Sequence, residues 1–355
     1  MRILTIVGAR PQFVKAAVLS RAIAGRKGVS EIIVHTGQHF DKNMSQVFFE
    51  EMDIPNPHYN LKINSLSHGA MTGRMLEKIE DVIIKEKPDV VVVYGDTNST
   101  IAGALAAKKL HVKVAHVEAG LRSYNMKMPE EINRILTDRI SDYLFCPTTA
   151  AVDNLKKEGF DNIDSSIYNV GDVMFDAARF YSQRSSEMSS VVNKLDLKDF
   201  ALCTIHRAEN ADNPLRLTAV FEALNKINKE VNVIMPLHPR TRSKISKLKI
   251  QPEFIITDPF GYFDIIEILK NCRIVLTDSG GLQKEAYFFK KPCITLREET
   301  EWVELVENGF NKLAGADTEK IIKSFYDLLN KRFDFEKKLY GDGKAGEKIV
   351  DVLSR

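Results

Sequence analysis

The feature that most constrains this fold is the alternation of short apolar runs with longer helical patterns along almost the whole chain. The runs VVVVYGD at 90–96 and RIVLTDSGG at 273–281 have apolar stretches without polar alternation, as expected of parallel strands covered on both faces. Between such runs lie stretches with helical spacing, such as 68–85, where apolar residues recur every three or four positions. This order of strand, helix and strand predicts right-handed βαβ units and doubly wound sheets.

The same rhythm divides the chain. It pauses around 168–172, and a new series of strands begins at residue 200. We therefore expect an α/β protein with two Rossmann-like doubly wound domains facing each other across a cleft, an N-terminal one at 1–170 and a C-terminal one at 171–343. The tail at 344–355 is expected to form a helix that packs back on the first domain. The expected strands are 2–8, 31–37, 90–95, 112–117, 143–147, 201–205, 232–237, 254–257, 273–277 and 293–296.

Length, charge and cysteine spacing exclude several classes of protein. A chain of 355 residues suits two domains of ordinary size. The formal net charge of +2 gives no overall field that attracts nucleic acid or an acidic membrane surface. Four scattered cysteines without a CxxC pair argue against a structural zinc site and fit a reducing compartment. Because no stretch suits a signal peptide or a membrane span, we expect a soluble, cytoplasmic protein without nucleic acid or membrane partners.

The residues that follow each strand are the candidates for ligand binding, because ligands of open α/β sheets bind beyond the carboxyl ends of the strands. The first strand ends in GARPQFVK at 8–15. Gly8 permits a tight turn, and Arg10 and Lys15 can direct two cations towards an anion at a helix N-terminus. The segment is neither a Walker loop nor a GxGxxG fingerprint. It can equally be a plain strand–turn–helix junction.

Three carboxylates follow at the same expected sheet edge. Asp96 follows the strand at 90–95, Glu118 follows the next strand, and Glu130 begins a helix in the segment PEEINR. Each alone can simply cap or start a helix. Three carboxylates at one edge, without a metal-ligand pattern, favour acid–base chemistry.

The second half carries a histidine and a glycine-rich turn. His206 follows the strand at 201–205, and Ser279, Gly280 and Gly281 begin a helix after another strand. Backbone N–H groups at such a turn suit a diphosphate, and Glu285 lies one turn further on, within reach of ribose hydroxyls. Helix capping and close packing explain the same residues without a ligand.

Six motifs in order carry a family resemblance. They are GxRPxxxK at 8–15, YGDTNST at 94–100, HVEAGLR at 116–122, PEExNR at 129–134, HRxEN at 206–210 and DSGGxQxE at 278–285. Together, and over nearly the whole chain, they resemble the non-hydrolysing UDP-N-acetylglucosamine 2-epimerases. The resemblance implies a glycosyltransferase-B-like fold, a homodimer, and a reaction without metal or nicotinamide cofactor.

The resemblance also implies roles for individual residues. The residues that match catalytic positions are Asp96, Glu118, Glu130 and His206. The residues expected to bind the UDP-sugar are Arg10, Lys15, Arg134, Ser279, Gly280, Gly281, Glu285 and Trp302. The implied reaction interconverts UDP-GlcNAc and UDP-ManNAc by eliminating UDP, which leaves 2-acetamidoglucal, and adding it back with C2 inverted. Asp96 and Glu118 are then expected to handle the C2 protons, and Glu130 to assist.

Departures from the usual pattern leave the sugar open. Gln12 stands where an acid is usual, Lys284 interrupts a usual QEE, and Trp302 stands where an arginine is usual. Phe13 and Trp302 resemble the branch that acts on UDP-2,3-diacetamido-2,3-dideoxy-glucuronate, which is therefore the second candidate substrate.

Other readings also stay open. The allosteric UDP-sugar site of bacterial members is matched only in part, by Gln38, Gln46 and Arg74. Three further classes remain: a hydrolysing 2-epimerase, a retaining glycosyltransferase and a non-catalytic nucleotide-sugar binding protein.

Overall fold

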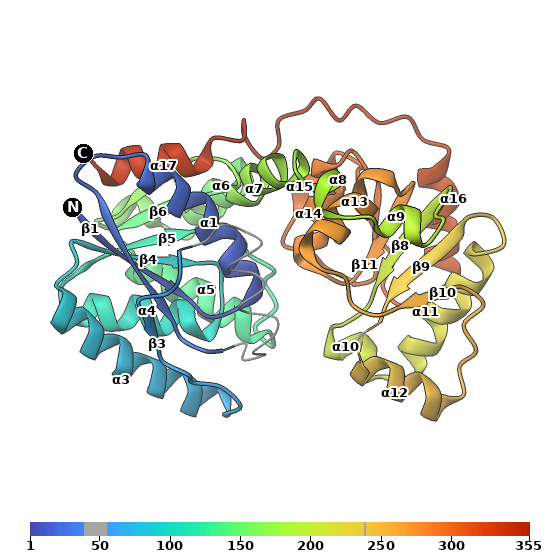
Figure 1. Cartoon of the computed structure of the whole chain (residues 1–355), viewed down its shortest axis with the longest axis horizontal. Helices are drawn as coiled ribbons and strands as arrows, with labels where there is room; N and C mark the ends of the chain where they lie inside the picture. The colour runs from blue at the N-terminus through green and yellow to red at the C-terminus, as the bar shows by residue number, and fades with distance from the viewer. Residues whose placement is uncertain (39–54, 238) are drawn as a thin grey trace. The chain divides into compact units, whose positions relative to one another are not determined.

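The computed structural model describes residues 1–38, 55–237 and 239–355. Packing divides the chain into two compact units, one formed by Met1–Ala177 with Lys338–Arg355 and the other by Ala178–Lys337 (Figure 1). Among the described residues, no helix is both long and apolar enough to cross a membrane.

The first unit is built on a seven-stranded parallel sheet in the order β3-β2-β1-β4-β5-β6-β7. Its strands are β1 (Arg2–Val7), β2 (Ser30–His35), β3 (Tyr59–Asn60), β4 (Val90–Tyr94), β5 (Lys113–Val117), β6 (Tyr143–Cys146) and β7 (Ser166–Asn169). The chain winds outwards from β1 in one direction and from β4 in the other, so the topological switch point lies between β1 and β4. Ligands of open α/β sheets bind at this point, beyond the carboxyl ends of the strands.

The helices of this unit cover the sheet on both faces, as Figure 1 shows. They are α1 (Arg10–Ala24), α3 (His68–Glu86), α4 (Asn98–Lys109), α5 (Pro129–Ile140), α6 (Thr149–Lys157) and α17 (Ala345–Leu353), while α7 (Val173–Ser182) runs through the boundary between the units. Helix α4 is rich in alanine and lies close on the sheet. A Cβ at Gly103 would lie 3.1 Å from the Ile6 side chain and 3.2 Å from that of Val93. The small residues of α4 therefore set the distance between helix and sheet.

The second unit is built on a six-stranded parallel sheet in the order β10-β9-β8-β11-β12-β13. Its strands are β8 (Phe200–Thr204), β9 (Asn232–Pro236), β10 (Ile255–Thr257), β11 (Ile274–Thr277), β12 (Cys293–Thr295) and β13 (Asn311–Leu313). Its helices are α8 (Ser185–Met188), α9 (Val191–Lys194), α10 (Ala208–Ala211), α11 (Pro214–Ile227), α12 (Pro239–Leu248), α13 (Tyr262–Asn271), α14 (Gly280–Phe288), α15 (Val303–Glu307) and α16 (Thr318–Leu329). The switch point lies between β8 and β11, so the turns after these two strands meet at one edge.

Two apolar cores, one on each face of this sheet, hold the second unit together. Phe221 of α11 and Phe325 of α16 belong to one core, and Leu269 of α13 and Ala286 of α14 belong to the other. Burial of a large apolar side chain contributes roughly 1.5–3 kcal/mol relative to exposure. The runs that lack polar alternation are thus covered on both faces, and the expected α/β class with doubly wound parallel sheets is confirmed.

Helix α17 belongs to the first unit and packs against α1. A Cβ at Gly346 would lie 2.6 Å from Cγ1 of Val18, so only glycine permits this approach. The Asp176 carboxylate accepts a hydrogen bond of 2.9 Å from the Gly346 N–H at the start of the helix. Burial raises the pKa of Asp176 to about 6 in spite of the backbone hydrogen bonds from Gly346 and Ala345.

This raised pKa predicts a stabilising substitution. Because folding raises the pKa of Asp176, its contribution to stability is present at low pH and is lost as the pH rises through about 6. Asp176→Asn keeps an acceptor oxygen and removes the buried charge, so we expect it to raise the melting temperature by roughly 2–4 °C at pH 8. The gain should shrink between pH 6 and pH 4, which melts followed by circular dichroism will measure.

Asp327→Asn is the matched control, because the hydrogen bond from Lys312 lowers the pKa of Asp327 and Asp327 is not among the charges that act on Asp176. That variant should lose stability at pH 8 where Asp176→Asn gains it. A lower melting temperature for Asp176→Asn at pH 8 would show that the charged form is the one that anchors α17.

Candidate active site

The turn after β1 is tied to the turn after β4 by one buried amide. Oε1 of Gln12 accepts hydrogen bonds from the Gly8 N–H at 2.8 Å and the Ala9 N–H at 3.0 Å. Its Nε2 donates to the Tyr94 carbonyl at 2.8 Å and to Thr97 Oγ1 at 3.0 Å. A carboxylate in this place cannot donate, so the amide at position 12 has a structural use of its own.

Lys15 and Glu118 form a buried ion pair at this edge. Nζ of Lys15 lies 2.5 Å from Oε1 of Glu118, and both side chains are only 8% exposed. Gly95 makes room for the pair, since a Cβ there would lie 3.2 Å from Lys15 Nζ and 3.5 Å from Glu118 Oε1. The cation expected to face an anionic ligand and the carboxylate expected to handle a proton are therefore in direct contact.

The backbone of Glu118 is held in an uncommon conformation. Its φ is +76°, in the left-handed region that disfavours residues with a Cβ by roughly 1–2 kcal/mol. The N–H groups of Glu118 and Ala119 both donate to the Phe145 carbonyl at 3.1 Å. Backbone strain of this kind persists only where the surroundings fix it, and it is concentrated at functional sites.

Asp96 lies beside Arg134. Nη2 of Arg134 pairs with Oδ2 of Asp96, and its Nη1 donates to Oε2 of Glu131 at 2.7 Å. Glu131 is fully buried and also accepts from the N–H groups of Ser123 at 2.9 Å and Tyr124 at 2.8 Å. Arg134, expected to contact substrate, is thus 3% exposed and paired with the candidate acid Asp96.

Of the two neighbouring acids at the start of α5, the buried one anchors the loop that precedes the helix. Glu131 has this role, whereas Glu130 lies half-exposed in the first turn. The sequence motif could not distinguish them, because both are acids that suit a helix start.

A buried polar network lies beneath the two carboxylate-bearing turns. His116 of β5 contacts the Gly95 carbonyl and the Asp138 carboxylate, each at 2.7 Å. Arg122 donates to Asp138 at 2.7 Å and binds both oxygens of Glu158, at 2.6 and 2.7 Å. No role for His116, Arg122 or Asp138 was expected from the sequence. The available signal was His116 itself, a polar residue inside an otherwise apolar strand.

In the second unit, Asp278 shapes the turn that carries His206. Asp278 is fully buried and accepts from the N–H groups of His206 and Arg207, each at 3.1 Å, and from Asn210 Nδ2 at 3.2 Å. Nδ1 of His206 lies 3.2 Å from Oδ1 of Asp278, and the His206 side chain is 55% exposed. The histidine is therefore oriented at one nitrogen and open to solvent elsewhere.

The two glycines at the start of α14 lie in different surroundings, one packed against a side chain and the other open to solvent. A Cβ at Gly280 would lie 2.2 Å from Oε1 of Glu301, so a larger residue there would displace the Glu301 carboxylate. At Gly281 the nearest atom would be Ser279 Oγ at 3.9 Å, and the residue is exposed. Ser279 caps the helix by accepting from the Leu282 N–H at 3.4 Å. The first turn of α14 thus presents an exposed glycine N–H at the positive end of the helix.

Two departures from the usual sequence pattern touch each other. Nζ of Lys284 lies 4.2 Å from the centroid of the Trp302 ring, and the two residues are 2% and 3% exposed. This is the geometry of a cation–π contact. The Trp302 indole also borders the helix start, because its Nε1 would lie 3.7 Å from a Cβ at Gly280.

The other residues singled out from the sequence lie partly outside the described structure and partly at other places in the two units. The side chain of Arg10, the position of Gln46 and residues 39–42 lie outside the described part of the structure. Oε1 of Gln38 accepts from the Ser99 N–H at 3.1 Å and from its hydroxyl at 2.8 Å. Arg74 lies on the surface of α3, 3.6 Å from Glu77. Glu285 is half-buried in α14.

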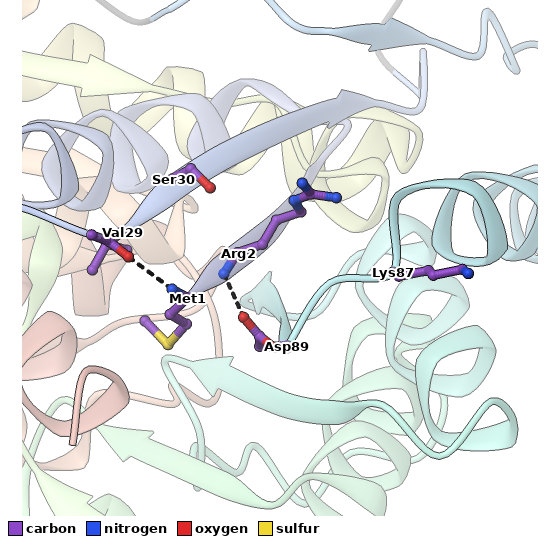
Figure 2. A pocket seen from close by; sticks show the side chains of 7 residues that line it. Met1, Arg2, Val29, Ser30, Lys87 and Asp89 are labelled. Atoms are coloured by element: carbon purple, nitrogen blue, oxygen red, sulfur yellow. Dashed lines mark hydrogen bonds between the residues drawn. The ribbon is translucent and has the colours of Figure 1, made fainter.

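A separate hollow contains none of the expected site residues. Figure 2 shows it, lined by Met1, Arg2, Gly28, Val29, Ser30, Lys87 and Asp89. It lies at the amino ends of β1 and β2, the opposite edge from the switch point. The contacts there, such as the Arg2 N–H to Asp89 at 2.6 Å, close the start of the sheet.

Comparison with known proteins identifies the family. A profile of the family described as UDP-N-acetylglucosamine 2-epimerase matches residues 21–354. This chain belongs to the UDP-N-acetylglucosamine 2-epimerase family. It is 57% identical to the UDP-2,3-diacetamido-2,3-dideoxy-D-glucuronate 2-epimerase of Pseudomonas aeruginosa, over 100% of both chains. It is 44% identical to the UDP-N-acetylglucosamine 2-epimerase of Methanocaldococcus jannaschii, over 100% of this chain and 99% of the relative.

A solved structure of the epimerase family confirms the fold class. The crystal structure of Methanocaldococcus jannaschii UDP-GlcNAc 2-epimerase in complex with UDP-GlcNAc and UDP matches with a TM-score of 0.92 and 44% identity. It covers 100% of this chain and 99% of the other. The expected glycosyltransferase-B-like class and the expected family are therefore both confirmed.

The His206 turn generates a prediction. Asp278→Asn replaces one acceptor oxygen by an NH₂ group that faces N–H donors, and leaving a buried donor unpaired costs about 1–3 kcal/mol. We expect a loss of stability of that order in urea unfolding and at least about fivefold weaker binding of UDP in calorimetry.

Asp258→Asn is the control, because the Asp258 side chain is 92% exposed and, among the residues that the structure describes, forms a surface pair with Arg242 at 3.1 Å. It should change neither quantity. Unchanged stability and UDP affinity in Asp278→Asn would mean that the turn keeps its shape without this carboxylate.

Proposed function

We propose that this protein is a non-hydrolysing 2-epimerase of a UDP-linked N-acetylated sugar. It interconverts UDP-GlcNAc and UDP-ManNAc by eliminating UDP from C1 and the proton from C2, which leaves 2-acetamidoglucal, and then adding UDP back to C1 while a proton is delivered to the other face of C2. The observation that supports this most is the pair of carboxylate–cation contacts at the switch point of the first sheet, Glu118 with Lys15 and Asp96 with Arg134. Full-length similarity to named 2-epimerases supports the same reaction.

The chemistry requires groups of these types. The C2 proton of the sugar has no adjacent carbonyl that would make it acidic, so the C1–O bond must loosen as the proton leaves. Inversion needs proton exchange at both faces of C2, and two positioned carboxylates provide it. Glu118 and Asp96 are each held by a charge-assisted hydrogen bond that fixes the orientation of the carboxylate, and Glu130 assists.

The second unit supplies groups for the departing diphosphate. His206 has a largely exposed ring, oriented through Asp278 at 3.2 Å. The first turn of α14 presents the exposed Gly281 N–H at the positive end of the helix dipole. Groups fixed in advance where negative charge develops lower the barrier without reorganisation. Arg10 and Lys15 are assigned to the same charge, Ser279, Gly280 and Glu285 to the nucleotide, and Trp302 to the sugar.

A second candidate differs only in the sugar. UDP-2,3-diacetamido-2,3-dideoxy-glucuronate is favoured by the 57% identity to the Pseudomonas aeruginosa enzyme, compared with 44% to the Methanocaldococcus jannaschii enzyme. The buried Lys284–Trp302 contact beside the start of α14 is a feature in which a sugar pocket can differ. The proposed reaction at C2 is the same for both sugars.

The proposed setting is a homodimer in the cytoplasm. Four cysteines are buried as free thiols in the described structure, and free buried thiols suit a reducing compartment. The homodimer is inferred from the family resemblance, and light scattering of the purified protein tests it.

Proton NMR in D₂O tests the function directly. We expect deuterium to enter C2, and the manno isomer to form with UDP still attached, when the protein receives UDP-GlcNAc or UDP-2,3-diacetamido-glucuronate. The faster sugar identifies the substrate. Release of free ManNAc would indicate the hydrolysing epimerase instead. Absence of C2 exchange with both sugars would contradict the carboxylate mechanism and leave the glycosyltransferase reading to be tested with an acceptor.

The two carboxylates are tested by isosteric amides. Asp96→Asn and Glu118→Gln remove the acid–base function and should each slow C2 exchange by about 10²–10⁴-fold. Glu130→Gln, a change at a half-exposed neighbour, should have a smaller effect because Glu130 only assists. Ordinary turnover in Asp96→Asn would remove Asp96 from the proton-transfer role.

A further inference from the structure

His116 is a buried polar side chain in the middle of the first sheet. It lies in β5, paired with Val93 of β4 on one side and Leu144 of β6 on the other, and is fully buried. A buried imidazole must satisfy both ring nitrogens with hydrogen bonds. The two partners of His116 therefore define what the side chain does.

Both partners are acceptors. Nε2 faces the Gly95 carbonyl oxygen and Nδ1 faces Oδ1 of Asp138, each at 2.7 Å. A carbonyl cannot donate, and Asp138 is fully buried between His116 and Arg122. Burial alone would raise the pKa of Asp138, but the hydrogen bonds and charges of His116 and Arg122 lower it below its usual value. A neutral imidazole donates from one nitrogen only, so with an acceptor facing each nitrogen we expect this ring to donate from both.

The Nδ1 arm is an anchor. Asp138 also accepts from the Gly120 N–H at 3.1 Å and from Arg122 at 2.7 Å, and Arg122 in turn binds Glu158. These contacts join α5 and the end of α6 to β5, and through the Gly120 N–H they also reach the turn after β5 that carries Glu118. Loss of this arm affects the stability of the unit.

The Nε2 arm reaches the candidate site. Gly95 has a φ of +61°, and its N–H donates to the Val117 carbonyl at 2.9 Å. His116 contacts the Gly95 carbonyl, so residues of β5 bind both the N–H and the C=O of Gly95. Asp96 follows Gly95 directly, and Glu118 lies two residues after His116, in the turn after β5. The missing side chain of Gly95 is also what leaves space for the Lys15–Glu118 pair.

We propose that His116 is a positioning residue of this enzyme, which clamps the Gly95 carbonyl through Nε2 and thereby fixes Asp96 relative to Glu118. The inference rests on the proposed function, because these two carboxylates are the groups assigned to the C2 protons. It adds a residue that touches no substrate and acts through the backbone of Gly95. Small displacements of reacting groups reduce rates by up to about 10²-fold, so the clamp acts on turnover rather than on binding.

Two substitutions separate the two arms of the ring. The amide nitrogen of glutamine can reach the position of Nε2, whereas that of asparagine reaches the position of Nδ1. His116→Gln therefore keeps the donor to Gly95 and loses the donor to Asp138, and His116→Asn does the reverse. We expect kcat for C2 epimerisation to be at least about tenfold lower in His116→Asn than in His116→Gln, with KM and the Kd for UDP equal within about threefold. Melting temperatures measure the anchor separately.

Equal kcat values in the two variants would overturn the proposal, as would wild-type kcat in His116→Asn. A purely structural role predicts that activity follows the melting temperature, so a more stable but slower His116→Asn supports the clamp.

A measurement on the unmodified protein covers the case in which a variant does not fold. In ¹H–¹⁵N spectra of the imidazole, both ring N–H groups of His116 should appear with slowly exchanging protons. A ring nitrogen without a proton would overturn the double-donor arrangement. This readout is independent of turnover, so failure of the wild type to exchange C2 protons counts against the proposed function and not against the clamp geometry.

Discussion

The buried ion pair between Lys15 and Glu118 is the interaction on which the first candidate site depends. Two charges with side chains only 8% exposed are stable together only when their geometry and surroundings satisfy them. Direct pairing of β1 with β4 and of β4 with β5 places the ends of the three strands side by side. Lys15 comes from the helix after β1, Glu118 from the end of β5, and the space between them from Gly95 at the end of β4. Each of these is a consequence of strand order.

In each unit one side chain joins the turns at the switch point, but the two units use different residue types. At both switch points the turns after two neighbouring strands must be held together without blocking the site. In the first unit Gln12 joins them, donating to the Tyr94 carbonyl at 2.8 Å and accepting from the Gly8 N–H at 2.8 Å. In the second unit the carboxylate of Asp278, after β11, accepts from the N–H groups of the His206 turn after β8. The residue type follows from the groups that it binds. An amide is needed where the side chain must both accept and donate, and a carboxylate suffices where all its partners are N–H donors.

Sequence reasoning reached the sheet and the residues at its edge because both follow from local patterns. Apolar runs identified all ten expected strands, and the three missed ones, β3, β7 and β13, are short and carry polar residues. All three are edge strands, β3 and β7 of the first sheet and β13 of the second, and most of their side chains are partly or fully exposed. Pairings between side chains distant in sequence were not predictable. Lys15 meets Glu118 across 103 positions and His116 meets Asp138 across 22, and no local periodicity encodes such contacts.

The contact between Lys284 and Trp302 shows that two departures from the usual motif pattern form one structural feature. Motif comparison treats the two departures as separate substitutions, yet their side chains lie 4.2 Å apart and are buried together. A buried ammonium must have favourable partners, and the indole face provides one of them, so neither residue can change without affecting the other. The loop that carries Trp302 is fixed to α14 by the hydrogen bond of 2.7 Å from Thr300 to Gln283. The role in sugar choice proposed for Trp302 would therefore belong to the helix start and the loop after β12 together, which a single-position reading of Trp302 does not capture.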